Sequence, residues 1–271
     1  KGNSVNSHIP EHLCRVHYEL LDDCVAIIRD LGPGCLVAKA DLRDAFRLCP
    51  ISPTDYRLLV FTWGGKYYYD KCLPMGSSIS CNYFECLSRA LQWIMVNRLG
   101  TKNMSHILDD FMFFGKKSSK DCATALRRFL ALAEDINLPI KSSKTVLPST
   151  TVILHGIQVN TDSMLLSLPM DKVKNALQLI NAMYKCKKVS LRQLQSLIGT
   201  LNFACKVVVP GRAFLRRLID LTCGVNNPSH HIRLNTEARK DLTAWRTFLR
   251  DYNVVSGCLP NDWTSANRAP A

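Results

Sequence analysis

Several features that would place this chain in a familiar class are missing from it. No apolar run approaches the ~20 residues that a membrane-spanning helix needs, and no signal-peptide pattern opens the sequence. The chain has no CxxC pair and no Cys/His cluster with zinc spacing, although it contains 12 cysteines. Internal repeats and low-complexity tracts are also missing. These features argue against a membrane partner, a zinc-finger protein and a repeat protein.

The cysteines lie mostly inside apolar stretches, as at Cys35, Cys86 and Cys205. A free cysteine in such a place behaves as a small hydrophobic residue. Because 271 residues are enough to bury a substantial core without cross-links, we expect reduced thiols rather than a disulfide framework. Reduced thiols indicate an intracellular protein, in the cytoplasm or the nucleus.

Acidic residues are scarce relative to basic ones. The chain has 22 Asp and Glu against 35 Lys and Arg, and a formal net charge of +13. Most of this excess lies in residues 165–250, which hold 15 Lys and Arg but 4 Asp and Glu, a local net charge of +11. A basic section of this kind favours a polyanionic partner, with nucleic acid as the first candidate, over a generic solvated surface.

The first two thirds of the chain alternate between strand-like and helix-like segments. The expected elements are a helix at 18–31, a strand at 35–41, a hairpin with strands at 57–63 and 66–73, a helix at 78–99, a strand–turn–strand around 106–115, a helix at about 120–136, and strands near 140 and at 152–159. Gly64-Gly65 supplies the turn of the first hairpin. This order predicts an α+β fold in which helices pack on one face of an antiparallel sheet.

After Pro169 the pattern changes to helices alone. The predicted helices are 171–184, one that starts at Ser190, 212–221 and 237–250. Ser190 and Gln193 form a capping box at the start of the second, and Pro210-Gly211 ends it. We therefore expect a domain boundary near residues 165–170.

Two adjacent carboxylates, Asp109 and Asp110, stand between apolar runs in the segment HILDDFMFFG at 106–115. Runs of this type predict two buried strands joined by a tight turn. Adjacent carboxylates between buried strands are unfavourable unless a cation or a hydrogen-bond network holds them, which favours a metal site. The alternative is that the two aspartates simply make the turn.

Asp41 is the third carboxylate of this set. It ends the predicted strand at 35–41, so three carboxylates converge at one sheet edge if that strand neighbours the Asp109-Asp110 hairpin. Such a set suits two Mg²⁺ ions, or Mn²⁺ in their place, and two ions roughly 3.5–4 Å apart can clamp the attacking and leaving oxygens of an in-line displacement. Together with the basic helical section, this arrangement predicts phosphoryl-transfer chemistry.

Six segments resemble the motifs of reverse transcriptases, in that family's order and approximate spacing. They are ADLRDAF at 40–46, LPMGSSIS at 73–80, LDDF at 108–111, NLPIKSSKT at 137–145, ILHGIQV at 153–159 and RQLQSLIGTLNFACKVVVPGRAFLRRL at 192–218. The resemblance is strongest to the DIRS-type (tyrosine-recombinase) retrotransposons and covers residues 3–250 approximately. It implies a polymerase palm followed by a helical thumb. It also implies an RNA-directed DNA polymerase that adds dNTPs to a primer on an RNA or DNA template.

Carried over residue by residue, the resemblance assigns Asp41, Asp109 and Asp110 to the catalytic Mg²⁺ ions. Phe46, five residues after Asp41, would be the aromatic gate that stacks under the sugar and rejects a 2′-hydroxyl. Its alternative is a plain core phenylalanine. A gate of this kind disfavours an RNA-templated RNA polymerase, which would have to accept the 2′-hydroxyl.

The resemblance also implies nucleotide and nucleic-acid contacts. Met75-Gly76 would lie against the template and the incoming nucleotide, unless Gly76 is only a turn glycine. Lys144 would approach the triphosphate, with Lys141 as a rival and a solvated lysine as the alternative. His155-Gly156 would form the primer grip, unless His155 is only a turn residue. The candidate phosphate contacts, some of which are expected to be ordinary surface charge, are Lys187, Lys188, Arg192, Lys206, Arg212, Arg216 and Arg217.

The chain departs from the family pattern in three places. Ile107 stands where the family has an aromatic residue, two positions before the first Asp of the pair. Basic finger residues precede a segment like GNSVNSHIP at 2–10 in the family, so we expect the chain to start inside a longer protein. No ribonuclease H segment is visible after Tyr252, and the recombinase is not in this chain, so both are expected in the parent polyprotein.

These considerations predict four regions. They are a finger remnant at 1–35, a palm at 36–168, a helical thumb and connection at 169–252, and a disordered tail at 253–271. The alternative to a polymerase is a catalytically silent, primer-template-binding remnant or a domesticated nucleic-acid-binding protein. Such a protein would bind in a salt-dependent way and incorporate nothing.

Overall fold

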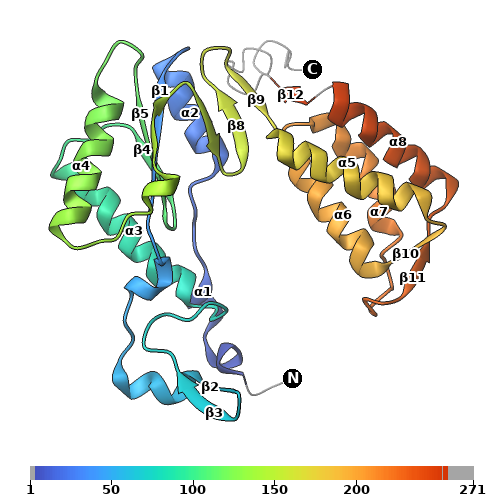
Figure 1. Cartoon of the computed structure of the whole chain (residues 1–271), viewed down its shortest axis with the longest axis horizontal. Helices are drawn as coiled ribbons and strands as arrows, with labels where there is room; N and C mark the ends of the chain where they lie inside the picture. Colours follow the sequence, from blue (N-terminus) through green and yellow to red (C-terminus); the bar gives the residue numbers. More distant parts are fainter. Residues whose placement is uncertain (1–3, 252, 256–271) are drawn as a thin grey trace, which may run out of the picture. The chain divides into compact units, whose positions relative to one another are not determined.

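The computed structural model describes residues 4–251 and 253–255 (Figure 1). It divides into two compact units, Lys1–Val152 and Ile153–Ala271. The first unit contains α1 (Glu11–Cys14), α2 (Leu21–Leu31), β1 (Leu36–Asp41), β2 (Val60–Trp63), β3 (Lys66–Tyr69), α3 (Ser80–Asn97), β4 (Met104–Ile107), β5 (Asp110–Gly115), α4 (Asp121–Asp135) and β6 (Val146–Ser149). Strand β7 (Thr151–Leu154) spans the boundary between the units. After it the chain forms β8 (Ile157–Asn160), β9 (Leu165–Ser167), α5 (Met170–Lys185), β10 (Lys188–Ser190), α6 (Leu191–Ala204), α7 (Arg216–Asp220), β11 (His231–Arg233), α8 (Thr236–Asp251) and β12 (Val254–Val255).

The main sheet of the first unit has the strand order β4-β5-β1-β6. The β4–β5 hairpin and the β1–β5 pair are antiparallel, as predicted, and Asp41 lies directly opposite Asp110 in the β1–β5 register. Because side chains alternate along a strand, Ala38 and Ala40 of β1 share a face with Phe111 and Phe113 of β5. This face is buried.

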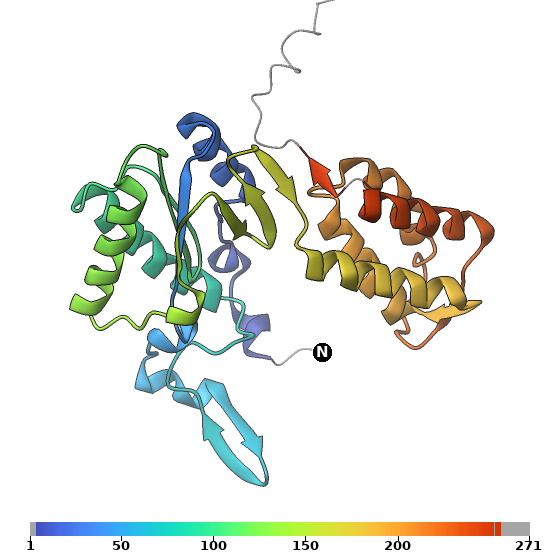
Figure 2. The same ribbon diagram turned by 45° about the horizontal axis from the view of Figure 1, so that its top comes forward.

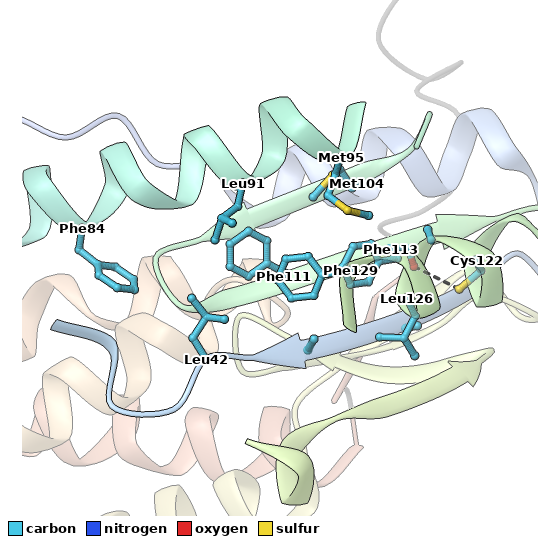
Figure 3. Close-up of a cluster of buried hydrophobic side chains, with 13 residues drawn as sticks. Leu42, Phe84, Leu91, Met95, Met104, Phe111, Phe113, Cys122, Leu126 and Phe129 are labelled. Atoms are coloured by element: carbon cyan, nitrogen blue, oxygen red, sulfur yellow. Dashed lines mark hydrogen bonds between the residues drawn. The ribbon is translucent and has the colours of Figure 1, made fainter. Parts of the chain in front are cut away.

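Helices α3 and α4 cover that buried face. Phe84 and Leu91 of α3 and Phe129 of α4 are at most 2% exposed and join the aromatic residues of β5 in one core cluster (Figure 3). The ring centroids of Phe111 and Phe129 lie 4.6 Å apart. The α+β fold, with helices packed on an antiparallel sheet, is therefore confirmed.

Helix α2 lies on the opposite side of the sheet from α3 and α4 (Figure 1). Cys24 of α2 is fully buried, and its thiol donates to Ser105 Oγ of β4 at 3.4 Å and approaches Met112 Sδ of β5 at 3.9 Å. The central strands are thus covered on both faces near the hairpin. Their burial explains why β5 reads as a nearly continuous apolar run rather than as an alternating one.

The β2–β3 hairpin projects away from the main sheet (Figure 2). Its turn is the predicted Gly64-Gly65 pair, with φ of 57° and 74°, and all eight strand residues are exposed. The predicted strand at 57–63 is wrong at its start, because Pro53–Leu59 forms a 3₁₀ helix and β2 begins at Val60. A proline at the first helical position favours that turn of helix.

The second unit combines a small sheet, in the order β12-β9-β8-β7, with helices α5 to α8. The predicted capping box is present at the start of α6, where Gln193 N–H donates to Ser190 Oγ and Ser190 N–H donates to Gln193 Oε1. The expectation of helices alone after Pro169 is wrong. Strands β10 and β11 form an antiparallel ladder there, and three residues each are too few for a period-2 pattern to be visible.

The boundary between the compact units falls at 152/153, upstream of the predicted palm–thumb boundary at 168/169. Of the predicted tail at 253–271, residues 253–255 are described and include β12, which pairs with β9. The remainder of that tail lies outside the described residues. All cysteines within 4–251 are free thiols. No helix in the described part of the chain is long and apolar enough to cross a membrane.

Candidate active site

The structure brings the three predicted carboxylates together at one end of the β1–β5 pair. Asp41 is the last residue of β1 and Asp110 the first of β5, and they are direct cross-strand partners. Asp109 occupies the turn between β4 and β5, and its carbonyl oxygen accepts a hydrogen bond from Leu42 N–H at 2.9 Å. Like charges directly opposite in a ladder are destabilising. The arrangement therefore favours a bound cation.

The turn that carries Asp109 has an unusual backbone. Leu108 has a φ of 49°, which a side chain with a branched Cγ rarely adopts. The fully buried Ser88 of α3 donates its hydroxyl to the Leu108 carbonyl oxygen at 2.7 Å. Strained backbone of this type persists where the surroundings hold it, and it occurs preferentially at functional sites.

The charges of the three aspartates disfavour one another. Partial burial raises the pKa of Asp109 above its ordinary value, and the charges of Asp41 and Asp110 raise it further, against the lowering effects of a hydrogen bond from its own backbone N–H and of the Lys144 charge. Lys39 Nζ donates to Asp110 Oδ2 at 2.9 Å, and Lys144 Nζ donates to Asp41 Oδ2 at 2.9 Å. Two lysines thus neutralise part of the negative charge.

The donor set suits a hard divalent cation, although it is not arranged as a metal cage. Among the residues that the structure describes, no three His, Cys, Asp or Glu side chains are placed to hold a metal ion. Asp41 and Asp110 each pair with a lysine instead. Three carboxylates offer only oxygen ligands, which Mg²⁺ and Mn²⁺ prefer. The residues therefore fit such an ion once the lysine contacts are exchanged for it.

Comparison with known proteins identifies the family. Residues 4–181 match the family model described as "Reverse transcriptase (RNA-dependent DNA polymerase)". The chain belongs to the reverse transcriptase family. Retroviral polyproteins are among its relatives: it is 29% identical over 179 residues to the Pro-Pol polyprotein of feline foamy virus and 25% identical over 197 residues to the Gag-Pol polyprotein of avian reticuloendotheliosis virus.

Each comparison covers most of this chain but less than half of the relative. The two alignments span 66% and 69% of the chain, against 14% and 16% of the polyproteins. The fold resembles that of a foamy viral protease-reverse transcriptase in complex with an RNA/DNA hybrid, with a TM-score of 0.66, 19% identity, and coverage of 84% of this chain and 29% of the other. A structure of a foamy viral protease-reverse transcriptase in complex with dsDNA gives a TM-score of 0.63 at 20% identity, with 87% of this chain and 45% of the other covered.

Within this reverse transcriptase domain, Phe46 lies at the rim of the core. It sits in the 3₁₀ helix Ala45–Leu48, just after Asp44 and Ala45, which have positive φ angles of 65° and 22°. Its ring packs edge-on against Phe84 of α3 at 5.4 Å, and the side chain is half-buried. The structure therefore gives Phe46 both core contacts and an open edge.

The Met75-Gly76 segment is exposed and is held by a residue that the sequence did not single out. Met75 is 79% exposed, and Gly76 has a φ of 98° with open space where a Cβ would stand. Asn6 Nδ2 donates to the Gly76 carbonyl oxygen at 2.8 Å, and Asn6 Oδ1 accepts from Ser78 N–H at 2.9 Å. The amide side chain thus fixes the shape of this loop from the start of the chain.

His155 and Gly156 form the turn between β7 and β8, with φ of 47° and 77°. A Cβ on Gly156 would lie 3.2 Å from Phe203 of α6 and closer still to Lys172 of α5. The positive φ favours glycine at this turn, and Phe203 leaves little room there for a side chain. The turn predicted from the sequence is confirmed.

The predicted phosphate contacts differ in their surroundings. Arg217 is already engaged, because its guanidinium pairs with the fully buried Asp241 and with Glu237 at 2.8 Å. Arg216 pairs with Asp220 at 2.9 Å, and Lys206 lies 5.3 Å from the centroid of the Phe203 ring. Breaking the Arg217 pair would leave a buried charge uncompensated. We therefore do not propose Arg217 as a phosphate contact.

Four side chains that contact the carboxylates or support their hairpin were not predicted. Lys39 stands two residues before Asp41, so the period-2 alternation of β1 could have placed it on the same face. From α3, Ser88 donates to the turn of the hairpin, and Glu85 meets the buried His106 of β4, with 3.1 Å between Glu85 Oε1 and His106 Nε2. Contacts between a helix and a hairpin 20 residues later leave no periodic signal in the sequence.

Proposed function

We propose that this chain is the palm and thumb of an RNA-directed DNA polymerase, which transfers nucleotides from dNTPs to a primer 3′-OH. The observation that carries the proposal is the cross-strand pair Asp41–Asp110 with Asp109 in the adjoining turn, inside a reverse transcriptase domain. Because the chain spans about 14–16% of the length of its polyprotein relatives, the activity itself is inferred for this segment.

We assign Asp41, Asp109 and Asp110 as ligands of two Mg²⁺ ions, with Mn²⁺ as a substitute. When bound, such ions neutralise the charge that develops on the transferred phosphoryl group. Lys144 keeps its proton beside these carboxylates, because the hydrogen bond and the charge of Asp41 raise its pKa. A protonated Lys144 is thus available to contact the triphosphate and to donate a proton to the pyrophosphate that leaves.

Around this centre, Phe46 is assigned as the gate against a 2′-hydroxyl and Met75-Gly76 as the surface under the template and the incoming nucleotide. The exposed side chain of Met75 and the unobstructed Gly76 backbone leave room for a nucleotide. His155-Gly156 is assigned to the primer 3′ end. The partners are accordingly a primer on an RNA or DNA template, and a dNTP.

We further propose that the element of origin is a retroelement of the DIRS type, in which this domain is linked to ribonuclease H and a recombinase. The sequence of residues 192–218 supports this subtype, because it resembles the thumb and connection segment of DIRS-type retrotransposons. The regions then correspond to fingers within 1–35, palm at 36–168 and thumb at 169–252. The retroviral relatives share the reverse transcriptase domain but do not distinguish among retroelement classes.

The test is primer extension on an RNA template with Mg²⁺, using the 271-residue chain and the product of its complete reading frame. We expect incorporation of dNTPs and strong discrimination against rNTPs, because the Phe46 ring would occupy the space of a 2′-hydroxyl. Equal use of rNTPs would contradict the gate. Tight, salt-dependent binding of primer-template without incorporation by either protein would favour the silent remnant instead.

Replacing Ser88 by alanine is expected to destabilise the fold and to slow incorporation. The Leu108 carbonyl oxygen would lose its donor, at a cost of about 1–3 kcal/mol, and the turn with Asp109 would be free to shift. A displacement of about 1 Å in a reacting group can cost about 100-fold in rate. Ser196→Ala, an exposed site in helix α6, is the matched control for helix propensity. Equal melting temperatures and rates for both variants would show that Ser88 does not hold the turn.

Replacing Lys144 by glutamine is expected to strengthen divalent-cation binding while it weakens incorporation. The Lys144–Asp41 ion pair, with Lys144 half exposed, competes with a cation for the carboxylate. Exposed pairs contribute about 0.2–1 kcal/mol, so the affinity for Mn²⁺ should rise about 1.5- to 5-fold in a direct titration. Lys141→Gln is the control, because the contact of Lys141 with Asp41 is made by its backbone N–H. Equal Mn²⁺ affinity in both variants would contradict the competition.

A further inference from the structure

A basic cavity of about 730 Å³ lies in the second unit. Its charged lining residues are all cationic, namely Lys187, Lys188, Arg233 and Arg239. Asn235 and Thr236, at the start of α8, add polar groups, and no carboxylate takes part in the lining. The cavity therefore collects four positive charges and offers them no internal counter-charge.

The ladder that builds the cavity carries an unfavourable pair. Lys188 of β10 and Arg233 of β11 are direct cross-strand partners, and like charges in that position are destabilising. Among the described residues, neither side chain forms an ion pair with a carboxylate. Two strands of three residues would be more stable without this repulsion. An anion between the two side chains would remove it.

The fourth cation is held rigidly. Arg239 of α8 donates to the carbonyl oxygens of Tyr184 at 2.6 Å and Cys186 at 2.5 Å, and its guanidinium lies 5.8 Å from the centroid of the Tyr184 ring. Glu237 and Asp241 of α8 each stand two residues from Arg239, but Glu237 pairs with Arg217 and with Lys240, each at 2.8 Å, and Asp241 pairs with Arg217. Carbonyl partners orient the guanidinium but leave its charge uncompensated, so the charge remains available to a ligand.

We propose that this cavity binds phosphodiester groups of the nucleic acid that the protein copies, through Lys187, Lys188, Arg233 and Arg239. Four cations around an open cavity fit several successive phosphates of a backbone better than one small anion. The identity of the polyanion rests on the proposed polymerase function. The site adds Arg233 and Arg239 to the two lysines predicted from sequence. It also accounts for the retention of a repulsive cross-strand pair.

The experiment measures the binding of an RNA/DNA hybrid at a series of salt concentrations for Lys188→Gln, Arg233→Gln and the double variant. Lys174→Gln, an exposed lysine on α5 that does not line the cavity, is the control. Each cavity substitution should reduce the slope of log K against log salt by about 0.9, and should weaken binding about eightfold at about 0.1 M salt. The melting temperature should rise or stay constant, because the cross-strand repulsion is removed.

Hybrid affinities and slopes for the double variant equal to those of Lys174→Gln would overturn the proposal. It would also fail if millimolar inorganic phosphate raised the melting temperature of the wild type but not of the double variant while the hybrid affinity stayed unchanged. That result would identify a site for free phosphate. Primer extension separates this inference from the proposed function. Loss of hybrid binding in a protein that never incorporates dNTPs would support the cavity and reject the polymerase.

Discussion

Replacing Asp109 by asparagine is expected to lower primer extension by at least about 100-fold. Removing a partner that only orients a metal ligand typically costs about 10–100-fold, so removing a ligand itself should cost more. Asp109 is positioned for this role by the turn that Leu108 and Ser88 hold, next to the Asp41–Asp110 pair. The measurement is single-nucleotide incorporation on an RNA template, with Asp135→Asn at the exposed end of α4 as the control.

The same variant should not lose stability. The pKa of Asp109 is raised in the fold, first by burial and then by neighbouring carboxylates, so its ionised form is penalised at neutral pH. Neutral asparagine removes that penalty, and the melting temperature in metal-free buffer should therefore rise or stay constant at neutral pH. The difference from wild type should vanish as the pH falls and Asp109 becomes protonated. Full activity in this variant would reject the assignment of Asp109. A large loss of stability would instead make any loss of activity uninformative about metal binding.

The fold of the first unit could be predicted because its elements follow simple rules. Helix α3 has apolar residues at helical spacing, β4 and β5 are apolar runs around a tight turn, and Gly64-Gly65 marks a hairpin. The three carboxylates meet only because β1 lies beside β5, which brings Asp41 opposite Asp110. The periodicity of the sequence does not predict that pairing. Only the resemblance to reverse transcriptases implied that the three aspartates act together.

What could not be predicted depends on contacts between distant segments. Asn6 holds Gly76 from 70 residues away, and Lys144 pairs with Asp41 from 103 residues away. Strands β10 and β11 were missed because each is three residues long and one of them, Lys188–Ser190, directly precedes a helix. The basic cavity depends on that ladder. The sequence could therefore show the positive charge of the section but not its location on one surface.

Replacing Gly211 by alanine is expected to destabilise the second unit by about 1–3 kcal/mol, the usual cost of overpacking. A Cβ on Gly211 would lie 2.6 and 2.9 Å from two ring atoms of the fully buried Trp245, and closer still to a third. Sequence reasoning assigned Gly211 only the ending of a helix. Gly199→Ala in α6 is the control, because open space surrounds that position, and the added methyl should stabilise the helix by about 0.5–1 kcal/mol.

A double-mutant cycle with Trp245→Phe identifies the cause of the loss. The phenyl ring lacks the outer ring atoms that the new methyl group would meet, so Gly211→Ala should cost less in the Trp245→Phe background. The expected coupling is about 0.5–3 kcal/mol, the range for residues in contact. The indole Nε1 of Trp245 has no hydrogen-bond partner among the described residues, so Trp245→Phe removes no such bond and leaves the coupling dominated by packing. Additive losses in urea unfolding would place the cost in the backbone of residues 209–214, and would show that Trp245 is not the reason for a glycine at position 211.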